Sequence, residues 1–152
     1  MPPEDKDPIL LHHPTRKSVG YFGAVCLRDG TFVYARELDR FNGQTFWDFM
    51  KLLQARSWQE GKRVVIMTDN AKFHHAKMHK AWREEQAPGF VLDYLPPYSP
   101  DLKPVERVWK MTRKLCIHDQ YFPTLDSVIA AVEKEFARWT RGSEVLRKLC
   151  AL

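Results

Sequence analysis

Two carboxylates stand where the sequence pattern changes, one at the end of a strand pattern and one at the start of a helical pattern. Asp69 directly follows the apolar, β-branched run Val64–Thr68, and Glu106 follows a proline-rich loop, with 36 residues between the two acids. Mg²⁺ prefers hard oxygen ligands, and two such ions about 3.5–4 Å apart stabilise both the attacking and the leaving oxygen of an in-line displacement at phosphorus. The pair therefore suggests metal-dependent phosphodiester cleavage.

The surroundings of Glu106 suit that chemistry. A helix N-terminus favours an ionised carboxylate, and Lys110, one turn further on, lies on the same helical face, where it can hold a phosphate. Each acid taken alone also has a simpler interpretation. Asp69 would then turn the chain together with Asn70, and Glu106 would be an ordinary first-turn glutamate.

The first half of the chain predicts a hairpin, a helix and a strand that lead up to Asp69. An Asp-Gly turn signal at Asp29–Gly30 separates two apolar or β-branched runs, Val19–Leu27 and Thr31–Ala35, and the first run is apolar on both faces. The following helix has Asn42 as its N-cap and an apolar face at helical spacing, made by Phe46, Phe49, Met50 and Leu53. Arg63–Thr68 then predicts a buried strand.

The second half predicts a helix over Ala76–Gln86 with Met78 and Trp82 on one face, a strand over Phe90–Leu95, and two further helices. The first of these has Pro104 in its opening turn and buries the face made by Val105, Val108, Trp109, Thr112 and Cys116. The last helix runs from the cap Thr124 to Gly142 and buries Val128, Ile129, Val132, Phe136 and Trp139. This order predicts an α/β fold, a mixed sheet flanked by helices, with Asp69 beyond a strand end, where such sheets place working residues.

Composition limits the class of protein. A chain of 152 residues supplies one domain. The 24 Lys and Arg against 19 Asp and Glu give a formal charge of +5. This charge is consistent with a nucleic-acid partner, and equally with a basic surface that is only solvated. Three widely spaced cysteines predict neither disulfides nor a cysteine zinc site. Without an apolar run of membrane-spanning length or a signal-peptide core, a cytoplasmic protein is expected.

Two stretches carry a family resemblance. TDNAKFHHA and DYLPPYSPDLKPVERVW resemble the catalytic core of the insertion-sequence 630 and mariner superfamily of transposases, and the likeness extends upstream to GYFGAV and FNGQTFWDFMKLL. The resemblance covers roughly residues 18–114. It implies a ribonuclease-H-like fold, an Asp-Asp-Asp/Glu triad holding two Mg²⁺ or Mn²⁺ ions, and double-stranded DNA, both transposon ends and target, as the partner.

The resemblance also assigns residues. Asp69 matches the second catalytic aspartate of the family and Glu106 its third acidic ligand, with Asn70 and His74 as polar companions. The loop that brings the last acid into place matches Tyr98, Ser99, Pro100 and Pro104. Basic residues behind Glu106 are expected to meet DNA phosphates: Lys110, Arg113 and Lys114.

One departure from the family pattern bears on activity. The first catalytic aspartate of the family lies on a central first strand upstream of the hairpin, and the sequence has no counterpart, since Asp5 and Asp7 follow no apolar run. We expect an N-terminal lead-in at residues 1–17 and a partial, N-terminally truncated endonuclease domain at 18–152 that is catalytically incomplete alone. Ile9–Leu11, a homodimer that exchanges elements, or a complementing N-terminal polypeptide would fill the gap.

Other interpretations remain open from sequence alone. The chain is either part of a transposase, acting in the bacterial cytoplasm at the nucleoid, or a non-catalytic DNA-binding relic or interaction module that keeps the fold. His74, His75 and His79 form an alternative transition-metal site, against their role as polar helix-start residues. Three aromatic side chains could either stack on nucleic-acid bases or pack in the core, and we favour core packing for them: Trp82, Trp109 and Trp139.

Overall fold

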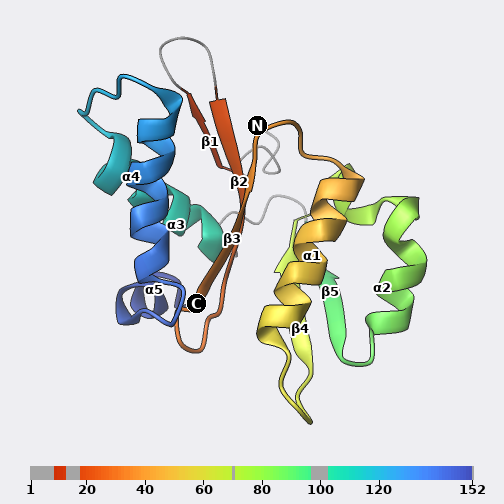
Figure 1. The fold of residues 1–152 in the computed structure, drawn as a ribbon. Helices are drawn as coiled ribbons and strands as arrows, with labels where there is room; N and C mark the ends of the chain where they lie inside the picture. Colours follow the sequence, from red (N-terminus) through yellow and green to blue (C-terminus); the bar gives the residue numbers. More distant parts are fainter. Residues whose placement is uncertain (1–8, 13–17, 70, 97–102, 152) are drawn as a thin grey trace.

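The computed structural model describes residues 9–12, 18–69, 71–96 and 103–151, and these form two small sheets with helices around them (Figure 1). The first sheet has the order β1-β2-β3 and the second pairs β4 with β5. The strands are β1 Ile9–His12, β2 Ser18–Val25, β3 Phe32–Glu37, β4 Val64–Thr68 and β5 Phe90–Tyr94. The helices are α1 Gly43–Ser57, η2 Lys72–His75, η3 Lys77–His79, α2 Lys80–Gln86, α3 Pro104–Thr112, η5 Arg113–Ile117, α4 Leu125–Arg138 and α5 Glu144–Leu149.

The predicted hairpin is confirmed as β2 and β3, which pair antiparallel from Gly20 opposite Glu37 to Val25 opposite Phe32. The turn depends on Asp29, whose Oδ1 accepts a hydrogen bond from the Thr31 N–H at 2.9 Å, and on Gly30, which has a φ of +74°. A left-handed backbone of this kind favours glycine, so the Asp-Gly pair sets the hairpin register.

Helix α1 begins at the predicted cap. The Asn42 side chain accepts from the Thr45 N–H, and Thr45 Oγ1 accepts from the Asn42 N–H, both at 2.9 Å. This reciprocal pair satisfies two backbone donors that the helix itself leaves free. The predicted apolar face is buried, with Phe46, Phe49, Met50 and Leu53 turned inward.

Side chains of β2 alternate between two hydrophobic cores on its opposite faces, because successive strand residues point to opposite sides. Figure 1 shows α3, α4 and α5 on one side of the hairpin and α1, α2, β4 and β5 on the other. The α3–α5 core consists of Val19, Tyr21, Phe32, Val108, Trp109, Cys116, Val128, Val132, Phe136, Trp139, Leu146 and Cys150. The α1 core consists of Phe22, Val33, Phe46, Phe49, Met50, Leu53 and Phe90.

Strand β4 forms as predicted, but it is not buried as predicted. Val64 and Ile66 pack against the α1 core, whereas Val65 and Met67 are 51% and 44% exposed. The alternation places these two on the opposite face, and the α3–α5 core gathers against β2 and β3 instead. The apolar sequence of β4 is therefore covered on one face only.

Two helix predictions need correction. The segment predicted as one helix over Ala76–Gln86 consists of η3 followed by α2, with Met78 of η3 exposed and Trp82 of α2 half-buried. The last predicted helix ends at Arg138, and α5 follows it. Ser143 caps α5, with its Oγ accepting from the Leu146 N–H at 3.2 Å, a start signal that the sequence analysis missed.

Candidate active site

Asp69 lies directly after β4, with its side chain buried and its carboxylate fixed by neighbours on several sides. Its Oδ1 accepts from the Ala71 N–H at 3.0 Å, which turns the chain out of the strand. His74 Nδ1 lies 2.9 Å from the same oxygen, and Lys103 Nζ lies 3.2 Å from Oδ2. The turning role and the site role considered for Asp69 are therefore compatible.

His74 orients this carboxylate from η2. Its Nδ1 also lies 2.9 Å from the Asp69 carbonyl oxygen, which can only accept, so Nδ1 carries the hydrogen. The ring is buried between Phe46 and Phe73, with centroids 4.4 and 4.5 Å away. The predicted companion His74 therefore contacts Asp69, whereas Asn70 lies outside the described residues.

Lys103 is the site residue that the sequence analysis missed. It immediately precedes α3, and its side chain is 4% exposed against 6% for Asp69. Removing either member of such a buried ion pair leaves an uncompensated charge, which typically costs about 3–5 kcal/mol. The only signal in the sequence was the positive charge of Lys103 just before Pro104. Nothing in the neighbouring sequence indicates that this side chain contacts Asp69, which lies 34 positions earlier.

Glu106 lies in the first turn of α3, on the helix that Lys103 leads into. The Glu106 N–H donates to the Lys103 carbonyl at 3.1 Å, so the second predicted acid follows directly on a residue that contacts the first. Its Oε1 is buried and has no hydrogen-bond partner among the described residues. A buried carboxylate oxygen left in this state is costly unless a ligand, ion or water satisfies it.

The chemistry of the two predicted acids suits a divalent cation. Carboxylate oxygens of Asp69 and Glu106 are ligands that Mg²⁺ and Mn²⁺ prefer, and a Glu106 oxygen that no described residue satisfies fits such an ion. The Lys103 ammonium supplies positive charge at Asp69. In the part of the chain that the structure describes, no three His, Cys, Asp or Glu side chains are close enough to hold one ion.

The predicted phosphate-binding residues lie on the exposed face behind Glu106. Lys110 on α3 and both Arg113 and Lys114 on η5 are exposed, while Val108 and Trp109 turn into the α3–α5 core. The helix thus separates a basic outer face from an apolar inner one, as its sequence pattern predicted.

The alternative histidine site is not assembled. His79 accepts from the Arg83 Nε–H through Nδ1 at 2.9 Å and donates from Nε2 to the Phe73 carbonyl at 2.8 Å, and burial lowers its pKa, so it is neutral. His75 stacks on Tyr94, with ring centroids 3.8 Å apart. Each imidazole therefore has its own structural contacts.

The three tryptophans considered as stacking platforms are core residues or pack beside a core. Trp109 and Trp139 belong to the α3–α5 core, and the half-buried Trp82 packs near Phe90, with ring centroids 6.0 Å apart. The burial of Trp109 and Trp139 and the packing of the half-buried Trp82 confirm the packing interpretation.

Comparison with solved structures defines the class of fold. The catalytic domain of the Mos1 mariner transposase superposes with a TM-score of 0.67 at 18% identity, covering 95% of this chain and 76% of that one. The Mos1 strand transfer complex gives 0.62 at 20% identity, covering 92% of this chain and 42% of that one. A simian T-cell lymphotropic virus intasome, solved in complex with a PP2A regulatory subunit, gives a TM-score of 0.62 at 14% identity. The match covers 83% of this chain and 45% of that one. The chain has the ribonuclease-H-like fold.

Sequence comparison then gives the family. The pattern of the family described as DDE superfamily endonuclease matches residues 1–129, so this chain belongs to that family. An uncharacterized protein of Sinorhizobium fredii, y4pE/y4sA, is 29% identical over 108 residues, which are 71% of this chain and 75% of the relative. The resemblance noted in the sequence is confirmed at the level of the family and the fold. No helix among the described residues is long and apolar enough to cross a membrane.

Proposed function

We propose that this chain is part of the catalytic domain of a transposase and works in DNA transposition by metal-dependent strand cleavage and strand transfer. The single observation that carries the proposal is the arrangement at the end of β4. There, the buried carboxylate of Asp69 meets the residue that leads into α3, and Glu106 follows one turn later with an unsatisfied oxygen. Membership of the DDE superfamily endonuclease family supports assigning metal-dependent chemistry to this pair of acids.

Asp69 and Glu106 would hold the divalent ions, Mg²⁺ or Mn²⁺. When bound, such ions polarise a scissile phosphate and stabilise the charge on the attacking and leaving oxygens. The chain itself contributes orientation, since His74 donates to the Asp69 carboxylate. Lys103, which contacts Asp69 Oδ2, would share this carboxylate with a bound ion.

We further propose that residues 1–152 are catalytically incomplete by themselves. No three His, Cys, Asp or Glu side chains of the described residues lie close enough together to hold one ion, which supports this proposal. In this proposal residues 1–17 are a lead-in, 18–152 are a partial endonuclease domain, and the protein acts on double-stranded DNA in the bacterial cytoplasm, at the nucleoid. Lys110, Arg113 and Lys114 would then meet the DNA phosphates.

Mn²⁺ binding, followed by electron paramagnetic resonance, tests the metal part of the proposal. Asp69→Asn and Glu106→Gln should each weaken Mn²⁺ binding by about tenfold or more, because ligand charge sets the affinity of such sites. Asp126→Asn, which removes an exposed first-turn acid from α4, should leave binding unchanged. Equal binding by all four proteins would refute the assignment of the ligands.

Nicking of supercoiled DNA tests the incompleteness. The purified chain with Mg²⁺ is expected to show no nicking above the level of Asp69→Asn. Robust nicking that Asp69→Asn abolishes would show that the described acids suffice.

DNA binding at several salt concentrations tests the basic surface. Replacing Lys110, Arg113 and Lys114 together by Ala should weaken binding and reduce the salt dependence, by about one unit of slope for each phosphate that these side chains neutralise. A triple replacement of Lys72, Lys77 and Lys80, which are also exposed, removes the same charge elsewhere. If both triple variants bind alike, the contribution is general charge and not a defined surface.

The second candidate function is a non-catalytic DNA-binding module that keeps the fold. One observation favours it, namely that Lys103 already neutralises the Asp69 carboxylate within a buried pair. This candidate expects DNA binding without Mn²⁺ binding, and salt-dependent DNA affinity that survives Asp69→Asn and Glu106→Gln.

A further inference from the structure

His74 orients Asp69 in the candidate site, yet it lies on a segment with little stability of its own. Helix η2 is a four-residue 3₁₀ helix without a side-chain N-cap. Within and around it, the His74 N–H donates to the Ala71 carbonyl at 2.9 Å and the Ala76 N–H to the Phe73 carbonyl at 3.4 Å. Hydrogen-bond geometry is poor in such short 3₁₀ pieces. Contacts from other elements must therefore hold η2 in place.

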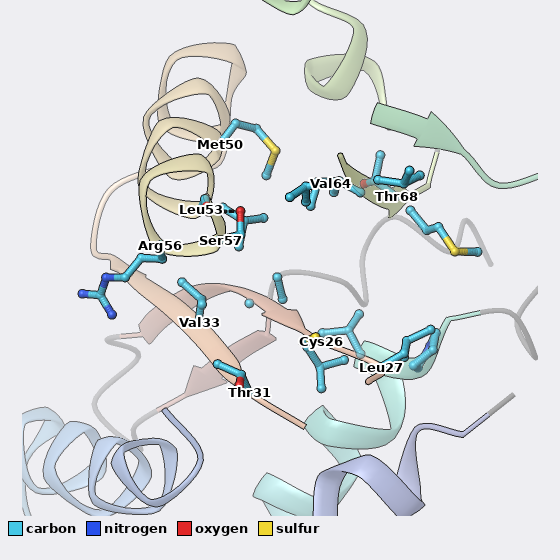
Figure 2. Close-up of a pocket in the computed structure, with 18 of the residues that line it drawn as sticks. Cys26, Leu27, Thr31, Val33, Met50, Leu53, Arg56, Ser57, Val64 and Thr68 are labelled. Atoms are coloured by element: carbon cyan, nitrogen blue, oxygen red, sulfur yellow. Dashed lines mark hydrogen bonds between the residues drawn. The ribbon is translucent and has the colours of Figure 1, made fainter. Parts of the chain in front are cut away.

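The placement of the His74 ring decides which oxygen receives its single Nδ1 hydrogen. Three oxygens lie within reach of Nδ1, namely the Asp69 carbonyl and Asp69 Oδ1, both at 2.9 Å, and Thr68 Oγ1 at 3.1 Å. Figure 2 shows Thr68 among the residues that line a pocket of about 530 Å³, and Asp69 and His74 line it as well. Because hydrogen bonds weaken steeply as they bend, a small shift of η2 would turn the hydrogen away from the carboxylate.

Two side chains outside η2 bond to its carbonyl groups. The Tyr94 hydroxyl, at the end of β5, donates to the His74 carbonyl at 2.9 Å. His79 Nε2, from η3, donates to the Phe73 carbonyl at 2.8 Å. Two successive peptide units of η2 are therefore fixed from two different elements.

Arg83 on α2 joins these two side chains. Its Nε donates to His79 Nδ1 at 2.9 Å, and its Nη1 donates to the Tyr94 hydroxyl at 3.2 Å. The hydrogen bonds thus run without a break from the Phe73 carbonyl through His79, Arg83 and Tyr94 to the His74 carbonyl. A satisfied polar network of this kind rigidifies the elements that it connects.

Burial keeps the network in the protonation states that it needs. His79 is 1% exposed, and burial lowers its pKa, so the neutral ring can accept from Arg83. Burial also raises the pKa of Tyr94, so its hydroxyl keeps the proton that it donates. The His75 ring covers the Tyr94 ring, with centroids 3.8 Å apart. All of these hydrogen bonds can therefore form at neutral pH.

We propose that Tyr94, Arg83 and His79 are positioning residues of the candidate site, which hold η2 so that His74 keeps its hydrogen on the Asp69 carboxylate. The inference rests on the proposed function, because it concerns the orientation of a carboxylate assigned there as a metal ligand. Groups that orient a metal ligand directly typically change metal affinity by about 10- to 100-fold. Residues one step further from the ion should change it by less.

Tyr94→Phe tests the positioning without changing a charge. It keeps the ring, removes the hydroxyl and takes this donor from the His74 carbonyl. We expect the Nδ1 hydrogen of His74 to exchange with water about three- to tenfold faster, since one hydrogen bond contributes roughly this factor to an opening equilibrium. Imidazole ¹H–¹⁵N NMR measures the rate, and the His74 signal is identified by its absence from His74→Leu.

Tyr21→Phe is the matched control for a general loss of stability. The Tyr21 hydroxyl donates to Glu133 Oε2 at 2.8 Å, a bond of similar length between β2 and α4. Both variants should lower Tm, but only Tyr94→Phe should accelerate exchange at His74. Equal acceleration in the two variants would mean that Tyr94 stabilises the fold as a whole, and the proposal would fail.

His79 gives a second pair of variants. His79→Leu removes both hydrogen bonds of the ring, whereas His79→Gln can restore the donor to the Phe73 carbonyl. Exchange at His74 should therefore be faster in His79→Leu than in His79→Gln. Unchanged exchange in both Tyr94→Phe and His79→Leu overturns the proposal.

Mn²⁺ binding separates this inference from the proposed function. Tyr94→Phe should weaken it by about threefold, and should have no further effect in a chain that carries His74→Leu, because Tyr94 acts through that ring. If Asp69→Asn weakens Mn²⁺ binding and Tyr94→Phe does not, the network is only structural and the inference is wrong. If Asp69→Asn leaves binding unchanged, the proposed metal site is wrong instead, while the exchange rates still decide whether Tyr94 positions His74.

Discussion

Strands β2 and β4 are both apolar along their length, yet only β2 is covered on both faces. The α3–α5 core packs on one side of β2 and the α1 core on the other, whereas β4 has the α1 core alone and leaves Val65 and Met67 exposed. The sequence of a strand therefore specifies the burial it requires, but separate elements must supply the cover. The exposed half of β4 is the half for which the described residues supply no such cover.

The covered side is tightly packed around Trp109. Its ring meets Phe32 and Phe136 with centroids 5.7 and 6.2 Å away, and no room exists for a Cβ atom at Gly23, which would collide with the Trp109 ring. Dense packing of this kind leaves little capacity to relax, so deletions there are costly.

The largest expected effect comes from Trp109→Ala. It should lower the free energy of unfolding by about 3–5 kcal/mol, because a fully buried aromatic side chain is lost and a cavity remains. Trp58→Ala, at a site that is 70% exposed, should change it by less than about 0.5 kcal/mol. Urea unfolding followed by circular dichroism measures both values, and similar values would mean that the α3–α5 core is not the main source of stability.

A smaller but more pointed contrast comes from two valines. Val132→Ala in the α3–α5 core should cost about 2 kcal/mol, for two buried carbons and their cavity, and Val65→Ala on the open face of β4 less than about 0.5 kcal/mol. The same urea-unfolding measurement gives both values, and equal losses in the two variants would remove the distinction between the two faces.

The smallest effect concerns the rim of the covered side, where Glu133 of α4 ties the helix to the hairpin. It accepts from the Tyr21 hydroxyl at 2.8 Å and from Arg36 Nε at 2.6 Å. Burial by itself raises the pKa of Glu133, but the hydrogen bonds from Arg36 and Tyr21 outweigh it and hold the pKa below its usual 4.5. A depressed carboxylate pKa stabilises the fold above the unfolded-state pKa, and this contribution disappears as the pH falls through the folded-state pKa.

Glu133→Gln should therefore cost about 1 kcal/mol at neutral pH, a value lowered for the 42% exposure of the Arg36 side chain, and should flatten the loss of stability between about pH 5 and 3. Glu84→Gln, in an exposed pair with Lys80 at 3.9 Å, should leave the pH profile unchanged. Urea-unfolding midpoints of the two variants and of the unaltered chain, measured across this pH range, test both expectations. A Glu133→Gln profile as steep as that of the unaltered chain would exclude Glu133 as the titrating group.

Local signals were enough to predict most of the fold. The Asp29–Gly30 turn, the Asn42 and Thr124 caps and the first-turn Pro104 are short-range features, and each begins or ends an element where it was expected. The exposure of Val65 was not predictable, because it depends on which other elements reach the second sheet. The α5 helix was missed because six residues give too short a pattern.

The candidate site was predictable in its residue types but not in its contacts. Asp69 and Glu106 were found from strand and helix boundaries, and His74 from the family resemblance. Lys103 was missed because its partner lies 34 residues away, and a buried ion pair of this kind has no local periodicity. The roles assigned to Asp69, Glu106 and the basic residues behind them stay proposals until metal and DNA binding are measured.

Mn²⁺ binding, measured side by side for the unaltered chain and for Asp69→Asn and Glu106→Gln, tests the candidate site most directly. We expect each substitution to weaken binding by about tenfold or more, because both carboxylates are assigned as ligands and ligand charge sets the affinity of such sites. Binding that neither substitution changes would contradict a metal site made by Asp69 and Glu106.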